Sequence, residues 1–238
     1  MRATLFGIPA SHPTLAGQLM LEHKGVQYRR IDLAAGVHRP ILRALGFPGK
    51  TVPAIRLDGA RLQGTTEIAL ALDALLPEQP LFPRDPERRR EVVEAEAWGN
   101  EVLQPIPRRL VWNGLGRDRS ELRTYLDDAR LGIPVSVAAR VAPPIARLAR
   151  RLNKATDENV QRDLAALPGI IDRVDELIER GVIGGAEPNA ADYQIATSVS
   201  FLLTMDDLRP MIEGRRAERL AREVVSNQPG HLPHVFAA

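Results

Sequence analysis

Four prolines within eleven residues divide this chain into two parts that have different hydrophobic patterns. The run, residues 76–86, reads Leu-Pro-Glu-Gln-Pro-Leu-Phe-Pro-Arg-Asp-Pro. Proline has no amide hydrogen and its ring clashes with the preceding helical turn, so a helix cannot continue through this segment. We therefore expect a first domain over residues 1–77, a proline-rich linker over 78–86 and a second domain over 87–238.

Strands and helices are expected to alternate before the prolines. Asp58-Gly59 lies between two short apolar runs and favours a tight hairpin, because glycine readily adopts a positive φ. Glycine and proline residues at 25 and 46–49 are expected to end helices. The predicted order is a strand at 4–7, a helix at 13–25, a strand at 26–33, a helix at 39–45, strands at 54–57 and 61–62, and a helix from 65 to 76.

The second part is predicted to be entirely helical. Helical patterns cover residues 91–111, 119–131, 144–152, 157–180 and 190–203, and Pro105 and Pro107 are expected to bend or end the first of these helices. The last segment is apolar on nearly all sides, which is typical of a buried central helix. Asn189 and Asp192 precede it with the spacing of a capping box, in which each side chain accepts a hydrogen bond from the other residue's amide.

The absence of cysteine excludes whole classes of chemistry. With no cysteine in 238 residues, the chain has no disulfide, no cysteine-ligated zinc or iron–sulfur cluster and no thiolate of its own. A thiol-dependent reaction would need a thiol from another molecule. Aromatic residues make up only 4% of the chain, so the core is expected to consist mainly of Leu, Ile, Val and Ala.

Charge and hydropathy argue against nucleic-acid, membrane and metal partners. The 32 basic and 30 acidic side chains are interleaved, as on a solvated helix face, and the basic clusters lack the aromatic spacing of a base-stacking surface. No segment reads as a secretory signal or a membrane span, so a cytoplasmic location is expected. His231 and His234 flank a proline with no cysteine or carboxylate nearby in the sequence, and we expect no metal site there.

The order of elements resembles the glutathione S-transferase superfamily over nearly the whole chain. Four local matches carry the resemblance: residues 5–11 as first strand and active-site loop, Thr-Val-Pro-Ala-Ile at 51–55, Thr-Thr-Glu-Ile-Ala at 65–69, and the capping box at 189–192. The resemblance implies an α/β thioredoxin-like N-terminal domain followed by an all-α C-terminal domain. It also implies glutathione as co-substrate, a small-molecule electrophile or a peroxide as second substrate, and a homodimer.

Ser11 is the candidate catalytic residue. It lies between the first strand and the first helix, where the helix N-terminus favours an anion. The segment is similar to the theta-class pattern Ser-Gln-Pro-Ser/Cys-Arg, with His12 in place of the Gln and Leu15 in place of the Arg. In that role the Ser11 hydroxyl donates a hydrogen bond to the glutathione thiolate. The alternative is that Ser11 only caps the helix, because serine is a preferred cap.

The candidate binding residues come from three further segments. If the Val52-Pro53 bond is cis, as in the family, the Val52 main chain can pair with the glutathione backbone as an added strand. His38 stands where theta-like members place a histidine on the glycine carboxylate, with Lys50 or Thr51 assisting; a plain exposed loop histidine is equally consistent with the sequence. Thr65 and Thr66 begin the helix that receives the γ-glutamyl end.

One departure from the family pattern leaves a second function open. Where the family has Glu/Gln-Ser, this chain has Gly64-Thr65, so the acidic partner of the glutathione ammonium is missing unless Glu67 or Asp58 replaces it. The alternative function is therefore a non-catalytic ligand-binding or protein-interaction module. Four residues of the first long helix in the second domain, Trp98, Gln104, Arg108 and Trp112, are candidates to face the cleft, although core packing or a dimer contact explains the two tryptophans equally well.

Overall fold

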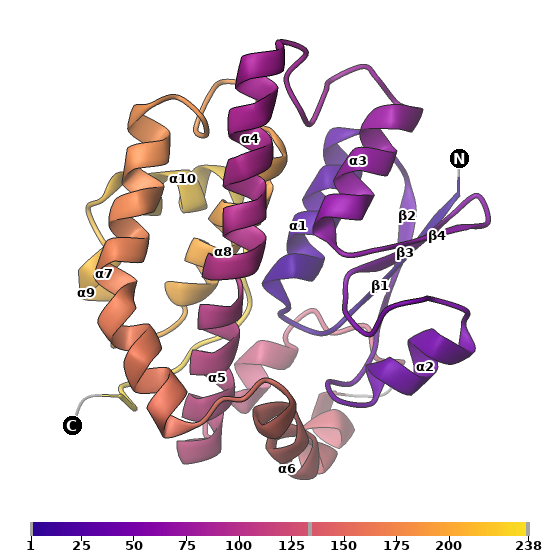
Figure 1. The fold of residues 1–238 in the computed structure, drawn as a ribbon. Coiled ribbons are helices and arrows are strands. Elements are labelled where there is room, and N and C mark those ends of the chain that lie inside the picture. The colour runs from indigo at the N-terminus through magenta and orange to yellow at the C-terminus, as the bar shows by residue number, and fades with distance from the viewer. Residues whose placement is uncertain (1, 133–134, 237–238) are drawn as a thin grey trace.

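The computed structural model describes residues 2–132 and 135–236, and its N-terminal part is a four-stranded sheet with three helices (Figure 1). The strands lie in the order β2-β1-β3-β4, with β1 parallel to β2 and antiparallel to β3. The sequence predicted this order of elements correctly. The bounds are β1 Ala3–Gly7, α1 His12–His23, β2 Tyr28–Asp32, α2 His38–Ala44, β3 Ala54–Leu57, β4 Ala60–Gln63 and α3 Thr65–Leu75.

The alternation of side chains along the central strands gives the sheet two buried faces. Leu5 pairs with Ile55 across β1 and β3, and both belong to the large core that includes α1 and α3. Phe6 pairs with Ala54 and packs with Leu42 of α2 in a smaller core on the other face. Because successive strand residues point to opposite sides, helices cover both faces of the sheet.

The rest of the described chain is helical, and α8 lies at its centre (Figure 1). Nearly every residue of α8 is buried, and the helix packs against α1, α4 and α10. It therefore joins the core of the sheet domain to the core of the helical domain. The bounds are α4 Pro86–Trp98, a π-helical segment Gly99–Leu103, α5 Pro105–Arg117, a 3-10 helix Leu122–Leu126, α6 Val135–Leu152, α7 Asp157–Glu179, α8 Ala190–Leu202, α9 Arg209–Ile212 and α10 Arg216–Val224.

Three predicted helices differ from those in the structure. The 91–111 helix is divided by the π-helical segment just before Pro105, and α5 then continues through Pro107 to Arg117. The predicted helix at 119–131 was wrong: only a short 3-10 helix forms, because the Asp118 side chain accepts the Ser120 amide in a turn and Asp128 has a positive φ of 61°. The predicted start at Pro144 was also wrong, since α6 runs through Pro143 and Pro144.

The proline-rich segment between α3 and α4 has no regular element, yet it is anchored in the core. Leu81 and Phe82 are almost completely buried, and the carboxylate of Asp73 accepts hydrogen bonds from both of their amides at 2.6 and 3.1 Å. The buried ammonium of Lys24 binds the same carboxylate at 2.8 Å. The connection is thus packed between the two parts of the molecule.

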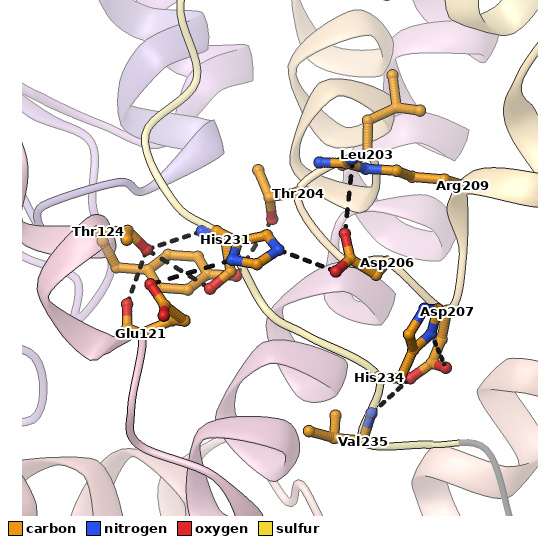
Figure 2. A network of polar contacts seen from close by, with 11 residues as sticks. Glu121, Thr124, Leu203, Thr204, Asp206, Asp207, Arg209, His231, His234 and Val235 are labelled. Atoms are coloured by element: carbon orange, nitrogen blue, oxygen red, sulfur yellow. Dashed lines mark hydrogen bonds and ion pairs between the residues drawn. The ribbon is translucent and has the colours of Figure 1, made fainter.

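The C-terminal segment folds back across the helical part and is held by two histidine–aspartate pairs (Figure 2). His231 lies 2.9 Å from Asp206, and His234 lies 2.8 Å from Asp207. Carboxylates that are distant in the sequence therefore do reach these histidines. Among the described residues, no group of three or more His, Cys, Asp or Glu side chains is arranged to hold a metal ion. No helix of the described chain is long and apolar enough to cross a membrane.

Candidate functional site

The candidate site is a cavity of about 390 Å³ between the sheet domain and the helical domain. Five of the site residues expected from the sequence line it together: Ser11, His38, Lys50, Thr51 and Val52. They come from the start of α1, the start of α2 and the loop before β3. The opposite wall consists of side chains of α5, α6 and the 122–131 segment, and most of that wall is apolar.

Ser11 is the N-cap of α1, and its hydroxyl donates to no acceptor among the residues that the structure describes. The Oγ atom accepts the amide of Thr14 at 3.3 Å, while the Ser11 carbonyl accepts the amide of Leu15 at 2.9 Å. A serine hydroxyl has one hydrogen to donate and two lone pairs, so accepting one amide leaves the hydrogen available. Capping and donation to a ligand are therefore compatible in this geometry.

The Val52-Pro53 peptide bond is cis, as the family resemblance implied. Within the described part of the chain, no hydrogen-bond partner is found for the Val52 amide or carbonyl. Both flanking residues, in contrast, are bound to the end of β4. The Gly64 amide donates to the Pro53 carbonyl at 2.9 Å, and the Gln63 side chain donates to the Thr51 carbonyl at 2.7 Å. The loop is thus fixed on both sides of an unpartnered peptide group at the cavity.

Gln63 is a positioning residue that the sequence analysis missed. It ends β4, and its carboxamide oxygen also accepts the Gly49 amide at 2.6 Å. One side chain therefore holds residues 49 and 51 of the cavity loop. A glutamine at a strand end carries no distinctive sequence signal, because only the hairpin geometry brings it beside that loop.

His38 is buried and uses both ring nitrogens on the main chain. Its Nδ1 accepts the Gly36 amide at 3.2 Å, so Nε2 carries the hydrogen and donates to the Lys50 carbonyl at 3.2 Å. Burial first, and the positive charge of Arg39 second, lower the pKa of His38. The ring is therefore neutral at pH 7 and joins the start of α2 to the cavity loop, rather than lying exposed in a loop.

Thr65 and Thr66 lie outside the cavity, in a separate shallow depression at the N-terminus of α3. Thr65 is buried, and the Thr66 hydroxyl donates to the buried carboxylate of Glu96 at 2.8 Å. Glu67 accepts the Gln63 amide at 3.0 Å and so joins the first turn of α3 to the end of β4. Asp58 does not replace the missing acidic residue, because it lies in the turn at the far end of β3, where it binds the Arg2 amide.

His12, next to Ser11, belongs to the core. Its ring stacks on Phe201 with centroids 4.9 Å apart, and Nε2 lies 3.2 Å from the Gln104 carbonyl. Burial, and then the charge of Arg108, lower the pKa of His12 to about 3. The ring is thus a neutral donor to the main chain of the other domain.

The first long helical stretch supplies only part of what the sequence suggested. Arg108 and Trp112 line the cavity from α5. Gln104 is buried and does not line the cavity. Its contact with the sheet domain is the hydrogen bond between its main-chain carbonyl and His12. Trp98 packs against the main core at the end of α4.

The C-terminal segment at 225–229 also reaches the Ser11 loop, and no sequence pattern indicates this contact. The Gln228 side chain donates to the Ala10 carbonyl at 3.1 Å, and residues 225–229 line a small recess on the other side of Ser11. This contact joins residues 218 positions apart. It supports the loop from behind, away from the main cavity.

Comparisons with known proteins agree with this architecture. Residues 5–80 match the family described as glutathione S-transferase, N-terminal domain. No curated protein matches the chain significantly.

Solved structures extend the similarity over the whole chain. The β-etherase LigF from Sphingobium sp. strain SYK-6 has a TM-score of 0.62 at 16% identity, covering 94% of this chain and 98% of that one. A glutathione S-transferase from Rhodospirillum rubrum has a TM-score of 0.61 at 16% identity, covering 98% and 96%. One from Methylobacterium radiotolerans, in complex with glutathione sulfonate, has a TM-score of 0.56 at 16% identity, covering 100% and 99%.

The cavity therefore lies where a thioredoxin-like domain meets a helical domain. Residues 5–80, about a third of the chain, match the glutathione S-transferase N-terminal domain family, and the chain as a whole has the glutathione S-transferase fold.

Proposed function

We propose that this protein is a glutathione S-transferase-like enzyme that binds glutathione in the cavity and activates its thiol for attack on a small apolar electrophile or a peroxide. The observation that carries the proposal is that one cavity contains both the Ser11 hydroxyl, at the N-terminus of α1, and the unpartnered main chain of Val52. The family match of residues 5–80 and the relative solved with glutathione sulfonate support the same ligand class.

Val52 holds the peptide part of glutathione in this proposal. An extended peptide that lies beside residue 52 satisfies its amide and carbonyl as an added strand would. Gln63 and His38 keep the loop in place through their contacts with residues 49, 50 and 51. Lys50, whose side chain is exposed at the cavity, is free to meet the glycine carboxylate, while His38 acts only by positioning the loop.

Ser11 acts on the sulfur. A free thiol has a pKa near 8.5, and only the thiolate is strongly nucleophilic. Lowering that pKa by one unit requires about 1.4 kcal/mol of preferential stabilisation of the thiolate, which one hydrogen bond to a charged group supplies. The Ser11 hydroxyl and the N-terminus of α1 are both placed to contribute.

A second function, a non-catalytic ligand-binding module, is favoured by the α3 end of the site. The Thr66 hydroxyl is bound to Glu96, and the Glu67 carboxylate accepts the Gln63 amide, so both acidic side chains near the start of α3 already have protein partners, and neither is left without one for the γ-glutamyl ammonium. In this alternative the fold and cavity are retained without a thiol site. The two functions predict opposite results for glutathione binding.

The experiment is a calorimetric titration with glutathione of the wild type, Gln63→Ala and, as a matched control, Gln18→Ala on α1. Among the described residues, the Gln18 side chain bonds only Glu22, and Gln18 does not line the cavity. We expect one site per chain, an affinity about tenfold lower for Gln63→Ala because two loop hydrogen bonds are lost, and an unchanged affinity for Gln18→Ala. No binding by the wild type would favour the non-catalytic module.

A further inference from the structure

Two arginines in the wall of the cavity each have a buried guanidinium nitrogen without a hydrogen-bond partner in the described part of the chain. Arg39 comes from α2 and Arg108 from α5, and both line the cavity. The Nε atom of each is shielded from solvent and has no hydrogen-bond acceptor among the residues that the structure describes. A shielded cationic donor without a partner is costly, so such groups are normally paired.

The neighbouring arginine shows that this chain does pair its buried guanidinium groups elsewhere. Arg109, next to Arg108 on the same helix, binds both carboxylate oxygens of Asp163 at 2.5 and 2.7 Å. Bidentate pairs of this kind are the preferred arrangement for a partly buried arginine. The lack of an acidic partner for Arg108 is therefore confined to the side of α5 that faces the cavity.

The only acidic side chain in the described cavity wall is already neutralised. Asp32 receives the guanidinium of Arg30 on its two oxygens at 3.0 and 2.9 Å, and the Arg130 amide at 2.8 Å. Arg39, Lys50 and Arg108 thus give the cavity an excess of positive charge. Burial and then the charges of Arg109 and Arg39 lower the pKa of Arg108, which agrees with the lack of a balancing anion.

The remainder of the wall near Arg108 is apolar. Trp112 and Leu115 follow it on α5, and Phe201 approaches from α8. An apolar surface with two unsatisfied guanidinium groups matches a molecule with an apolar body and one anionic group. A fully apolar ligand would leave both charges without a partner.

We propose that the second ligand of the cavity is an apolar molecule that carries a carboxylate or sulfonate, bound by Arg39 and Arg108. This inference rests on the proposed function in one respect, namely that the ligand is the electrophile. The glutathione thiolate then forms a carbon–sulfur bond to the ligand, and a leaving group such as chloride departs with its electron pair. The anionic group fixes the ligand in the same cavity that contains Ser11.

Binding is tested first without glutathione, so that the result does not depend on catalysis. Calorimetry compares naphthoate with its neutral methyl ester for the wild type, Arg108→Gln, Arg108→Lys and a control, Arg43→Gln. Arg43 is exposed on the same helix as Arg39 and lies outside the cavity. We expect the wild type and the control to bind naphthoate about tenfold or more tightly than the ester, Arg108→Gln to lose the preference, and Arg108→Lys to retain part of it.

Turnover is tested next with chlorodinitrobenzoate and its methyl ester in the presence of glutathione. Arg108→Gln should lower kcat/KM about tenfold for the carboxylate and leave the ester within a few-fold. Retained naphthoate preference without any turnover would support this inference and reject the proposed enzyme. Equal binding of naphthoate and ester by the wild type would overturn it, as would loss of glutathione affinity in Arg108→Gln, because the guanidinium would then serve glutathione itself.

Discussion

His12 shows at the residue scale how the neighbour of a candidate catalytic group can serve the fold alone. It stacks on Phe201 and donates to the Gln104 carbonyl, and both partners belong to the helical domain. Its low pKa, about 3, means that the folded protein keeps the ring neutral well below the range in which a free histidine becomes charged. This difference makes stability depend on pH.

We predict that His12 destabilises the protein as the pH falls below about 6.5. The unfolded chain then binds a proton that the folded chain does not, so the free energy of unfolding falls by up to about 1.4 kcal/mol per pH unit until the pH approaches the folded pKa. Above pH 6.5 the effect is absent. Urea unfolding of wild type and His12→Gln at several pH values measures it: the difference between the two should change with this slope, and parallel profiles would contradict the assignment.

At the residue scale, the sequence was sufficient to single out the functional groups that belong to local motifs. Ser11 lies at a strand–helix junction and Val52 precedes a proline, and both patterns can be read within a few positions. Gln63 and Arg39 could not be singled out in the same way. Their roles depend on which loop or domain comes close in space, and no local pattern contains that information.

At the scale of elements, the cap of α8 is the clearest case in which sequence and structure agree. Asn189 Oδ1 accepts the amides of Ala191 and Asp192 at 2.9 and 3.3 Å, and Asp192 Oδ2 accepts the Asn189 amide at 2.8 Å. The second oxygen of Asp192 accepts the Gly184 amide at 2.6 Å. The box therefore fixes both the helix start and the loop before it.

We predict that the double variant Asn189→Ala, Asp192→Ala loses about 1 to 3 kcal/mol of unfolding free energy, because two caps of a buried helix are removed. Burial raises the pKa of Asp192 to about 6, so the measurement belongs above pH 7, where the carboxylate is ionised. Thr156→Ala, which removes a single cap bond from α7, is the control and should cost about 1 kcal/mol. An unchanged urea midpoint for the double variant would show that the box is not formed.

Element boundaries were predictable where capping and turn residues set them and less so where packing did. The segment at 119–131 has helical spacing, but Tyr125 is buried and its hydroxyl lies 3.2 Å from Thr204 of the helical core. That tertiary contact suits a short 3-10 turn. Conversely, α6 continues through two prolines, although proline favours the first turn of a helix.

At the scale of the whole molecule, the sheet domain and the helical domain meet through contacts between residues that are far apart in the sequence. α1 packs on α8, and the Ala190 amide at the start of α8 donates to the Leu81 carbonyl at 2.8 Å. The cavity is a consequence of this docking. The order of elements together with the local matches to the glutathione S-transferase superfamily was sufficient to predict the fold. The composition of the wall opposite Ser11 depends on helix orientation, which no single-chain pattern specifies.

We propose, as the central claim about the whole molecule, that Ser11 stabilises the thiolate of glutathione held in this cavity. The decisive measurement is the ultraviolet thiolate absorbance of bound glutathione as a function of pH, for wild type, Ser11→Ala and Ser11→Gly. Glycine is nearly as good an N-cap as serine, but it has no hydroxyl to donate and adds no charge, so it separates capping from donation.

We predict that the thiol bound to the wild type has a pKa below the free value of about 8.5 and that both variants raise it. Ser11→Gly should do so with little loss of stability, and turnover at neutral pH should fall about tenfold for each unit by which the pKa rises. The same thiol pKa in all three proteins would contradict the claim and leave Ser11 as a helix cap only.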